Sequence, residues 1–507
     1  MLHAEAKDWI TRKYTSGTYR GSDRVNPIIQ ELFRFYDQRL RNIATQIASR
    51  DLVAFLLHQY DEANEILHGN GILDLNERKE WRHIEPLLRR SIKYIVELLC
   101  IQQRTGLPCI ASKRDLVATE IALECGEVAA DLAEMSNRVY FLFPEHCAVV
   151  VHANSNPQAI TVSITGKHEG YDERFFERIV RDRNHRDRFV GPKPQFDIHT
   201  DTHMRFLDSA FSSSFGMSYA EFIAGLIAVI DGSRPAGKGH FPTLFIRRMD
   251  LIDQLRKSGR PLDAIEAMLR GFTVTPDDLI IENRVLWNAK QQSRAFRRGF
   301  FSFPHETGEH LAFSKAMAQE SLIHLISSVS FQRLPREWLL SAIRPALAEL
   351  SNAAGNWSEE IVARNLQEIG YQGGGVKGTL RTSLGTLEIP AEVGDLDFLG
   401  YNSRRREILL VEDKMTFTGL EAQLWRDDID QFVWGKKPYA DQFRRKRAWV
   451  SENFECICRL MGAPIESNFD ARLLTLYPSI ASEFIEDFQC QSITEFMVHF
   501  SENAPCS

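Results

Sequence analysis

The segment that most constrains the fold of this chain is GDLDFLGYNSRRREILLVEDKM, residues 394–415. In its first half Asp395 and Asp397 alternate with Leu396 and Phe398, which predicts a strand with the acidic pair on one face and the apolar pair on the other. YNSRRR then predicts a turn. EILLVEDK follows as a second strand, and its nearly continuous apolar run is typical of a buried central strand. The pattern predicts a β-hairpin.

Charged residues end this apolar strand. Glu412 and Lys414 are two positions apart and therefore project from one face, and pairing across the turn would place Asp397 beside Glu412. Buried charge is strongly unfavourable unless it is compensated, so we expect a divalent cation, Mg²⁺ or Mn²⁺, held by the carboxylate oxygens. Such a metal activates water and neutralises a phosphoryl oxygen, while Lys414 would orient the water or stabilise the developing charge. The alternative is a surface hairpin with a Glu–Lys ion pair of little energetic value.

These residues resemble the PD-(D/E)xK nuclease superfamily, in its restriction-endonuclease-like Mrr and archaeal-resolvase branch. Its members share an Asp, a hairpin and then Glu-x-Lys, which here are Asp397 and, fifteen positions later, Glu412-Asp413-Lys414. They also have a preceding helix with a Glu near its start. NWSEEIVARNLQEIGY fits that helix, and it adds Glu359 as a further catalytic and metal-binding residue. The resemblance covers about residues 356–480.

The resemblance implies a Mg²⁺-dependent endonuclease that hydrolyses DNA phosphodiester bonds, with defence against foreign DNA such as phage or plasmid as the setting. Two rivals remain open: a catalytically degenerate nucleic-acid-binding or scaffold protein with the same fold, and an RNA-directed nuclease. Cutting both strands of a duplex needs two sites, which favours a homodimer or higher homo-oligomer. A partner defence protein is the other partner considered.

The chain departs from the family pattern at two positions, and a third leaves an assignment open. Asp413 stands where an apolar residue usually points into the core, which indicates either an acidic residue that supports the metal ligands or a strand register shifted by one. Leu396 replaces the proline before the first Asp. Asp395 is a rival for that first carboxylate. If Asp413 faced the metal in place of Glu412, the site would have to be rebuilt.

Nucleic-acid contacts are predicted on two further segments. Basic residues cluster on the hairpin turn and in 431–447, where Trp434, Tyr439, Phe443 and Trp449 are interleaved. Contact with backbone phosphates is one interpretation and a solvated helix face is the other. The predicted contacts are Arg404, Arg405, Arg406, Gln431, Lys436, Lys437, Arg444 and Arg445, and the same basic run contains Lys446 and Arg447.

The rest of the chain predicts an α-rich multidomain protein. Residues 1–135 form a helical region, with apolar positions at helical spacing over about 25–135. Residues 136–345 mix strand and helix signals in a recognition or regulatory region. Within and beyond it we expect a strand over 277–287 and helical structure over 306–350. AAGNW, 353–357, suggests a hinge. Residues 346–507 then form the C-terminal α/β restriction-endonuclease-like domain, with a central mixed sheet flanked by helices. GGGVKGT, 373–379, is predicted to be a flexible loop, and HTDTH, 199–203, a polar loop in preference to a metal site.

Bulk properties favour a cytoplasmic protein. The 507 residues suggest several domains, and the net charge of −7 argues against a general nucleic-acid coat, although a local basic patch would suffice for a nuclease. The eight cysteines are scattered without C-x-x-C spacing, which predicts reduced thiols. We expect neither a secretory signal at the N-terminus nor a membrane span, because no apolar stretch is long enough.

Overall fold

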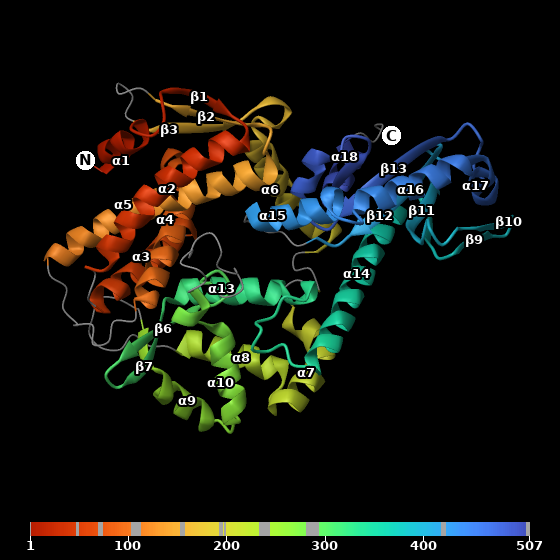
Figure 1. The fold of residues 1–507 in the computed structure, drawn as a ribbon. Helices are drawn as coiled ribbons and strands as arrows, with labels where there is room; N and C mark the ends of the chain where they lie inside the picture. The colour runs from red at the N-terminus through yellow and green to blue at the C-terminus, as the bar shows by residue number, and fades with distance from the viewer. Residues whose placement is uncertain are drawn as a thin grey trace. The chain divides into compact units, whose positions relative to one another are not determined.

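The fold was analysed in a computed structural model, in which the chain divides into two compact units (Figure 1). Unit 1 comprises residues 1–140, 147–163 and 195–350, and unit 2 comprises residues 141–146, 164–194 and 351–507. Helices predominate and several sheets accompany them, which confirms a helix-rich α/β chain of more than one unit. The structure describes residues 2–46, 50–68, 75–102, 113–152, 158–191, 196, 199–232, 244–279, 294–416 and 422–502.

The boundaries of the two units differ from those expected. Residues 141–146 and 164–194, predicted to belong to the middle region, are part of unit 2. The predicted hinge at 353–357 is wrong, because helix α14 (Ile343–Glu368) continues through it. A single glycine costs a helix only about 1 kcal/mol, and Gly355 has open space where a Cβ would stand, so the long helix accommodates it.

Unit 1 contains the predicted N-terminal helices and two small sheets. The helices expected over residues 25–135 are α2 to α5. Among the described residues the strand orders are β1-β2-β3 and β4-β7-β6-β5. The helices are α1 (Leu2–Thr11), α2 (Ser22–Ala44), α3 (Arg50–His68), α4 (Leu75–Ile101), α5 (Lys113–Asn137), α7 (Thr200–Phe215), α8 (Tyr219–Gly232), α9 (Arg248–Arg256), α10 (Leu262–Phe272), α11 (Pro276–Leu279) and α13 (Lys315–Ser327), with the 3₁₀ turn η4 (Val329–Phe331) and the π-turn η1 (Arg138–Leu142) that leads into unit 2. The strands are β1 (Gly17–Arg20), β2 (Cys147–Val151), β3 (Ile160–Ile164), β4 (Leu244–Arg247), β5 (Thr273–Val274), β6 (Phe300–His305) and β7 (Gly308–Phe313).

Three local predictions in unit 1 need correction. Residues 308–313, expected to be helical, form β7, which pairs with β6 across a tight turn. HTDTH is no loop, because α7 begins at Thr200 and buries His203. The strand expected over 277–287 begins as the short helix α11, and its remainder lies outside the described residues.

The described helices were also tested for membrane spans. No single one of them is long and apolar enough to cross a membrane, and only α7 and α8 taken together, bent by 84°, satisfy the length and composition criteria.

Unit 2 is built around one mixed sheet. Among its described residues five strands lie in the order β14-β13-β12-β11-β8, with β12 in the middle. β11 pairs antiparallel with β12 and β8, and β13 pairs parallel with β12 and β14. The strands are β8 (Gln372–Val376), β11 (Leu396–Asn402), β12 (Glu407–Lys414), β13 (Asn468–Thr475) and β14 (Gln489–Ser492), and β9 (Thr379–Thr382) and β10 (Gly385–Glu388) form a separate hairpin. The helices are α6 (Tyr171–Phe189), the shared α14, α15 (Ala422–Ile429), α16 (Tyr439–Glu452), α17 (Phe454–Met461) and α18 (Ile493–Glu502), with the short turns η2 (Gly166–His168), η5 (Asp430–Trp434) and η6 (Ile480–Phe484).

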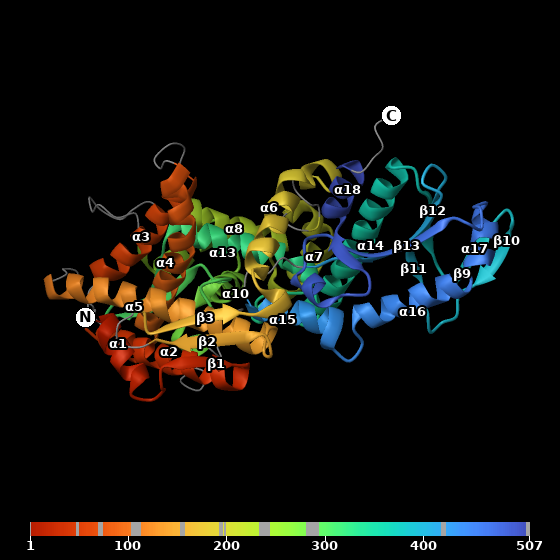
Figure 2. The same cartoon turned by 90° about the horizontal axis from the view of Figure 1, so that it is seen from above.

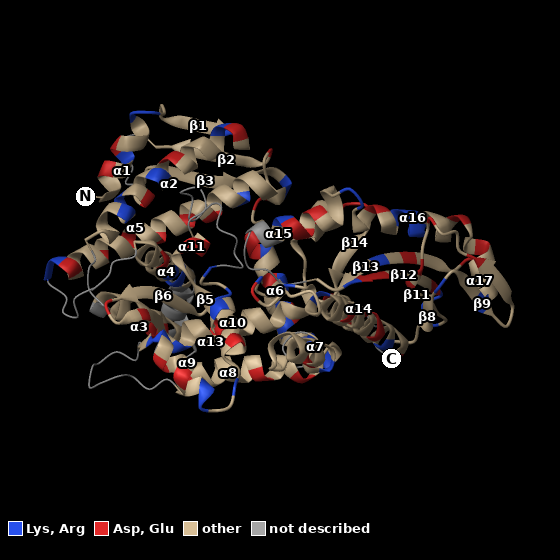
Figure 3. Ribbon diagram, turned by 60° about the horizontal axis from the view of Figure 1, so that its bottom comes forward, with Lys and Arg blue, Asp and Glu red and all other residues tan. Residues whose placement is uncertain are grey.

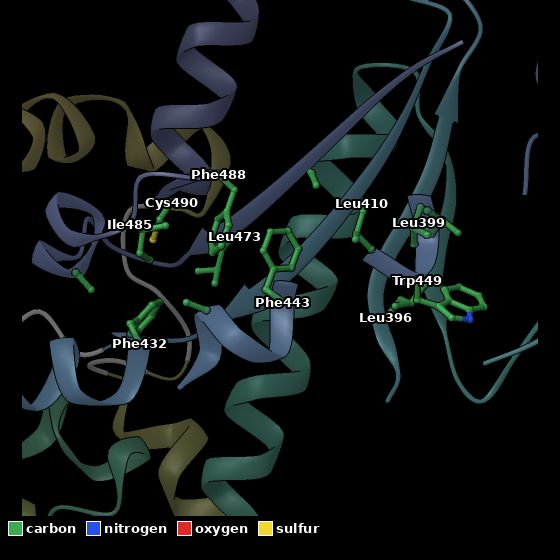
Figure 4. Packing of buried hydrophobic residues seen from close by; sticks show 14 of the residues in the cluster. Leu396, Leu399, Leu410, Phe432, Phe443, Trp449, Leu473, Ile485, Phe488 and Cys490 are labelled. Atoms are coloured by element: carbon green, nitrogen blue, oxygen red, sulfur yellow. The ribbon is translucent and has the colours of Figure 1, made fainter. Parts of the chain in front are cut away.

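Apolar side chains cover both faces of this sheet. On one face Leu410 and Leu473 pack against Phe443 of α16 (Figure 4). On the other face Leu409 and Val411 belong to a second core with residues of α14 and α18. β12 is therefore covered from both sides, as its continuous apolar run predicted.

Helix α6 belongs to unit 2 through specific contacts with its C-terminal residues. Arg178 forms a bidentate ion pair with Glu495, at 2.6 and 3.0 Å. Asp182 is buried and accepts a hydrogen bond of 2.6 Å from the hydroxyl of Ser492. These partners are more than 300 residues apart in the sequence, so no local sequence pattern predicts their contact.

Strand β8 replaces the loop that the sequence predicted at 373–379. A Cβ on Gly373 would lie 2.1 Å from the carbonyl oxygen of Leu399, so only glycine permits the close pairing with β11. The glycines therefore serve strand pairing here. Beyond β8 the β9–β10 hairpin extends beside α17 (Figures 1 and 2).

Candidate active site at the ends of strands β11 and β12

Neighbouring residues at the end of β12 point to opposite faces of the sheet. Glu412 forms an ion pair with Lys446 of α16, whereas Asp413 lies among groups that include Ser358 and Glu359 of α14. Both carboxylates are almost fully buried, with 2% and 5% of their surface exposed. The alternation follows the two-residue period of the strand.

Asp397 joins the two strands at this end of the sheet. The β11–β12 ladder ends at the pair Phe398–Val411, and beyond it Asp397 Oδ2 accepts a hydrogen bond of 2.8 Å from the backbone N–H of Asp413. The same oxygen lies 3.4 Å from Lys414 Nζ. Its other oxygen, Oδ1, has no hydrogen-bond or ion-pair partner among the described residues. The expected neighbourhood of Asp397 and the Glu-x-Lys strand is therefore present.

The rival carboxylate, Asp395, has a different place. It precedes β11, is exposed, and accepts a hydrogen bond of 3.1 Å from the backbone N–H of Gly378. The strict alternation predicted for 395–398 is wrong, because an irregularity in the pairing between Leu396 and Leu399 places these two leucines in one core and Phe398 in the other.

Lys414 connects the acidic groups. Its Nζ lies 2.8 Å from Glu412 Oε1 and donates to the backbone oxygen of Asp413 at 2.8 Å, which confirms that Glu412 and Lys414 share a face. Burial alone would lower the pKa of Lys414, but the carboxylates of Glu412 and Asp397 outweigh it and raise that pKa. Lys414 is thus a fixed ammonium group, suited to stabilising negative charge and unsuited to accepting a proton.

Lys446 was not predicted as part of this site. It is only 6% exposed, and its Nζ forms an ion pair with Glu412 Oε2, so Glu412 lies between two lysines. The signal lay in helical spacing: Ala440, Phe443 and Val450 are buried on α16, and Lys446 occupies the same apolar stripe. A lysine on a stripe that faces the core needs a buried partner of opposite charge. The neighbouring basic residues made Lys446 look like part of an exposed basic run.

Glu359 approaches the site from α14. The sequence predicted that Glu359 lies near the start of its helix, but it lies in the middle of α14. Its carboxylate has no hydrogen-bond or ion-pair partner among the described residues. Burial raises the pKa of Glu359, the charge of Asp397 raises it further, and Lys414 and Lys377 lower it. Glu359 is therefore close enough to the strand-end charges to interact with them.

Several carboxylate oxygens at this end of the sheet could bind a divalent cation. Asp397 Oδ1 and the Glu359 carboxylate lack partners among the described residues, and Asp413 Oδ1 is a buried oxygen without a hydrogen bond. Hard carboxylate oxygens are the ligands that Mg²⁺ prefers. The two lysines hold both oxygens of Glu412, however, and no three His, Cys, Asp or Glu side chains of the described part stand in metal-binding geometry. The carboxylate donors are chemically suited to Mg²⁺, but in this arrangement the ammonium groups of Lys414 and Lys446 neutralise Glu412.

Asp413 gives this end of the sheet a pH dependence. Burial raises the pKa of Asp413 to about 7, and the charge of Asp397 adds to the effect. In the unfolded chain this carboxyl ionises near pH 4, so between about pH 4 and 7 the folded state binds more protons and its stability falls as pH rises. The penalty is complete above about pH 7 and absent below about pH 4.

We therefore expect Asp413→Asn to stabilise unit 2 at pH 8 by up to about 4 kcal/mol, because the variant has no carboxylate to ionise. Amide hydrogen exchange of β12, measured without metal over a pH series and corrected for intrinsic exchange, reports the difference. The advantage should vanish near pH 4. An advantage of equal size at both ends of the series would contradict the assigned ionisation.

The predicted nucleic-acid contacts lie elsewhere in unit 2. Arg444 is held by Asp487 at 2.9 Å and by Asp441 at 2.7 Å, and the guanidinium of Arg405 stacks 3.6 Å from the ring of Phe500. Both acidic and basic residues occur along α16 and α17 (Figure 3). Within the described part of the chain, none of the predicted side chains forms a hydrogen bond or ion pair with the strand-end carboxylates. All of them except Arg405 are exposed, namely Arg404, Arg406, Gln431, Lys436, Lys437, Arg444 and Arg445.

Comparisons with protein-family models, with curated proteins and with solved structures found no match to this chain. Within the chain itself, Asp397, Glu412 and Lys414 form one connected group, because Lys414 contacts both carboxylates.

Proposed function

We propose that unit 2 is a restriction-endonuclease-like domain that hydrolyses phosphodiester bonds of DNA with the help of a divalent cation. The observation that carries this proposal is the contact of Lys414 with both Asp397 and Glu412 at the end of a strand whose middle residues, 408–411, are all apolar and buried. A surface Glu–Lys pair would not require such burial. Polar groups placed here at an energetic cost indicate a chemical role.

Each residue of this group has a distinct task in the proposal. Asp397, Glu359 and Glu412 would hold Mg²⁺ or Mn²⁺, and the bound cation would supply an activated water and charge neutralisation at the phosphate. Lys414, as a permanent ammonium group, would orient the water or stabilise the charge that develops on the phosphoryl oxygens. Asp397 has a further structural task, since its Oδ2 also fixes the backbone of Asp413.

The setting is part of the same proposal. Resemblance to the nuclease superfamily suggests defence against foreign DNA in the cytoplasm, with a homodimer or a partner defence protein completing the double-strand cut. Unit 1 would then recognise a ligand or regulate the nuclease. These statements rest on the resemblance alone, which concerns only the region around 356–480.

A second candidate function has one observation in its favour. Because Lys446 and Lys414 together neutralise Glu412, the site is compensated without any metal. A nucleic-acid-binding or scaffold protein that had lost the chemistry would show this arrangement. The two candidates differ in whether the carboxylates act on a substrate.

A cleavage assay separates the candidates. Wild-type full-length protein with Mg²⁺ is expected to cleave duplex DNA faster than single-stranded DNA or RNA. Lys414→Ala should lower the rate by about 10²- to 10³-fold, because it removes a fixed positive charge from the reaction site. Lys257→Ala, which removes an exposed lysine of unit 1, is the matched control and should retain the wild-type rate.

Each outcome of the assay is informative. Faster cleavage of RNA would assign the RNA-directed alternative. Wild-type activity undiminished in Lys414→Ala would place the chemistry elsewhere. Failure to cleave any of the three substrates would favour the degenerate binding protein.

A further inference from the structure

A groove lies beside the free edge of the sheet in unit 2. Its volume is about 550 Å³, within the roughly 300–1,000 Å³ typical of ligand sites. It runs between β8, the β9–β10 hairpin and the end of α17. The lining residues come from 372–377, 379–382, Leu399, Leu460 and Met461.

The charge of this groove is one-sided. Lys377 and Arg381 are exposed, line the groove, and have no ion-pair partner among the described residues. No lining residue is acidic, and Gln372, Thr379 and Thr382 add polar side chains. In a chain of net charge −7, an uncompensated basic groove indicates an anionic ligand.

The floor of the groove is open where a side chain could stand. A Cβ added at Gly374 would meet no atom within 4 Å, and the backbone there does not require glycine. The neighbouring Gly373 must be glycine because β11 approaches it closely, so the reason for glycine differs between the two positions. At Gly374 the space is left to the groove, which allows a ligand to approach the backbone of β8 closely.

One end of the groove lies near the candidate active site, although no residue of that site lines it. Val376 pairs with Leu396, so the last residues of β8 lie beside the start of β11, where Asp397 stands. Lys377 follows directly, and its charge acts on Glu359. A ligand lying along Lys377 and Arg381 would therefore end at the carboxylates.

We propose that this groove binds the sugar–phosphate backbone of a single nucleic-acid strand and directs it to Asp397 and Glu359. The inference rests on the proposed function for the identity of the substrate and extends it by naming the binding surface. It also differs from the contacts predicted on the hairpin turn and on α16.

The lining also predicts how the strand is bound. Among the described residues no aromatic side chain lines the groove, so bases have no stacking platform there and binding should be independent of sequence. The affinity should instead depend on salt, because two phosphate contacts release about 0.7 counterions each on a single strand.

The test is fluorescence anisotropy of labelled single-stranded DNA with the full chain in EDTA, so that no cleavage occurs. Lys377→Gln/Arg381→Gln should weaken binding on the order of ten-fold and make the slope of log affinity against log salt shallower by about 1.4. Gly374→Val should weaken binding without changing the circular-dichroism melting curve. The matched controls are Arg183→Gln/Arg188→Gln on α6, with the same loss of charge, and Gln489→Val on β14, the strand at the opposite edge of the sheet.

The outcomes separate this inference from the proposed function. Binding by the groove variants equal to that of the charge-matched control would overturn the groove, whatever the cleavage assay shows. Loss of binding in the groove variants of a protein that never cleaves would support the groove and refute the nuclease. Equally tight binding of an acidic peptide such as oligoglutamate would overturn the assignment to nucleic acid.

Discussion

Asp397→Asn is expected to lower the rate of DNA cleavage by about 10³-fold or more, the largest effect on activity predicted for this chain. The substitution keeps the shape of the side chain and leaves an oxygen that can accept the N–H of Asp413, so the strand pairing should persist. It removes the negative charge that faces Lys414 and that acts on Glu359. The measurement is the single-turnover rate on duplex DNA at saturating protein and Mg²⁺.

Asp395→Asn is the matched control, because the same chemical change is made two residues away. Asp395 is exposed and bonds only to the backbone of Gly378, so its variant should cleave at the wild-type rate. If both variants lost activity equally, the defect would lie in the turn or the strand. If only Asp395→Asn were inactive, the first carboxylate of the site would have to be reassigned.

The strand-end contacts could be predicted because they follow from local periodicity. Four apolar residues from Ile408 to Val411 fix β12 as a buried strand, and residues two apart on a strand share a face. The proximity of Glu412 and Lys414 is therefore contained in one short segment. The turn at 403–406 then brings Asp397 to the same end of the sheet.

Other features depend on distant partners and left no reliable local signal. The glycines of β8 suggested a loop, and only the close approach of β11 to Gly373 explains why they form a strand. Likewise α6 is highly charged, typical of a solvated helix, yet Arg178 and Asp182 bind residues of the C-terminal segment. Tertiary contacts here override what composition favours.

The orientation of Asp413 was left open by the sequence for a different reason. Two adjacent acidic residues at a strand end are distinguishable only once both faces of the sheet are known. Helix α16 supplies Lys446 on the face of Glu412, and α14 supplies Glu359 on the face of Asp413. The faces of Glu412 and Asp413 are therefore distinguished by the helices that cover them, because only α16 places a lysine ammonium group against its carboxylate.

Lys446→Met is expected to reduce the free energy of opening β12 by about 3 kcal/mol in the absence of metal, the largest loss of stability predicted at the site. Lys446 and Glu412 are both buried, and removing one partner leaves a carboxylate in the protein interior. Lys414 remains 2.8 Å from that carboxylate, which places the loss at the lower end of the range of about 3–5 kcal/mol for broken buried pairs. Amide hydrogen exchange of β12 in EDTA measures it.

Two further variants give this prediction its control. Lys437→Met removes an exposed lysine and should change the opening free energy by less than about 0.5 kcal/mol. Glu412→Gln/Lys446→Met should cost clearly less than Lys446→Met alone, because the buried charge is then absent. A double variant as unstable as the single one would mean that lost packing, and not the uncompensated carboxylate, causes the defect.

Adding Mg²⁺ to Lys446→Met then separates the two candidate functions. If Glu412 can bind a cation, the metal should take over the compensation that Lys446 provided, and protection of β12 should rise with Mg²⁺ concentration by mass action. The same titration on Glu412→Gln/Lys446→Met should show a smaller rise, since one donor is gone. Protection that stays constant over the titration would mean that Glu412 does not bind the metal and only forms ion pairs with lysine. The proposal of metal-dependent cleavage would then lose its central carboxylate.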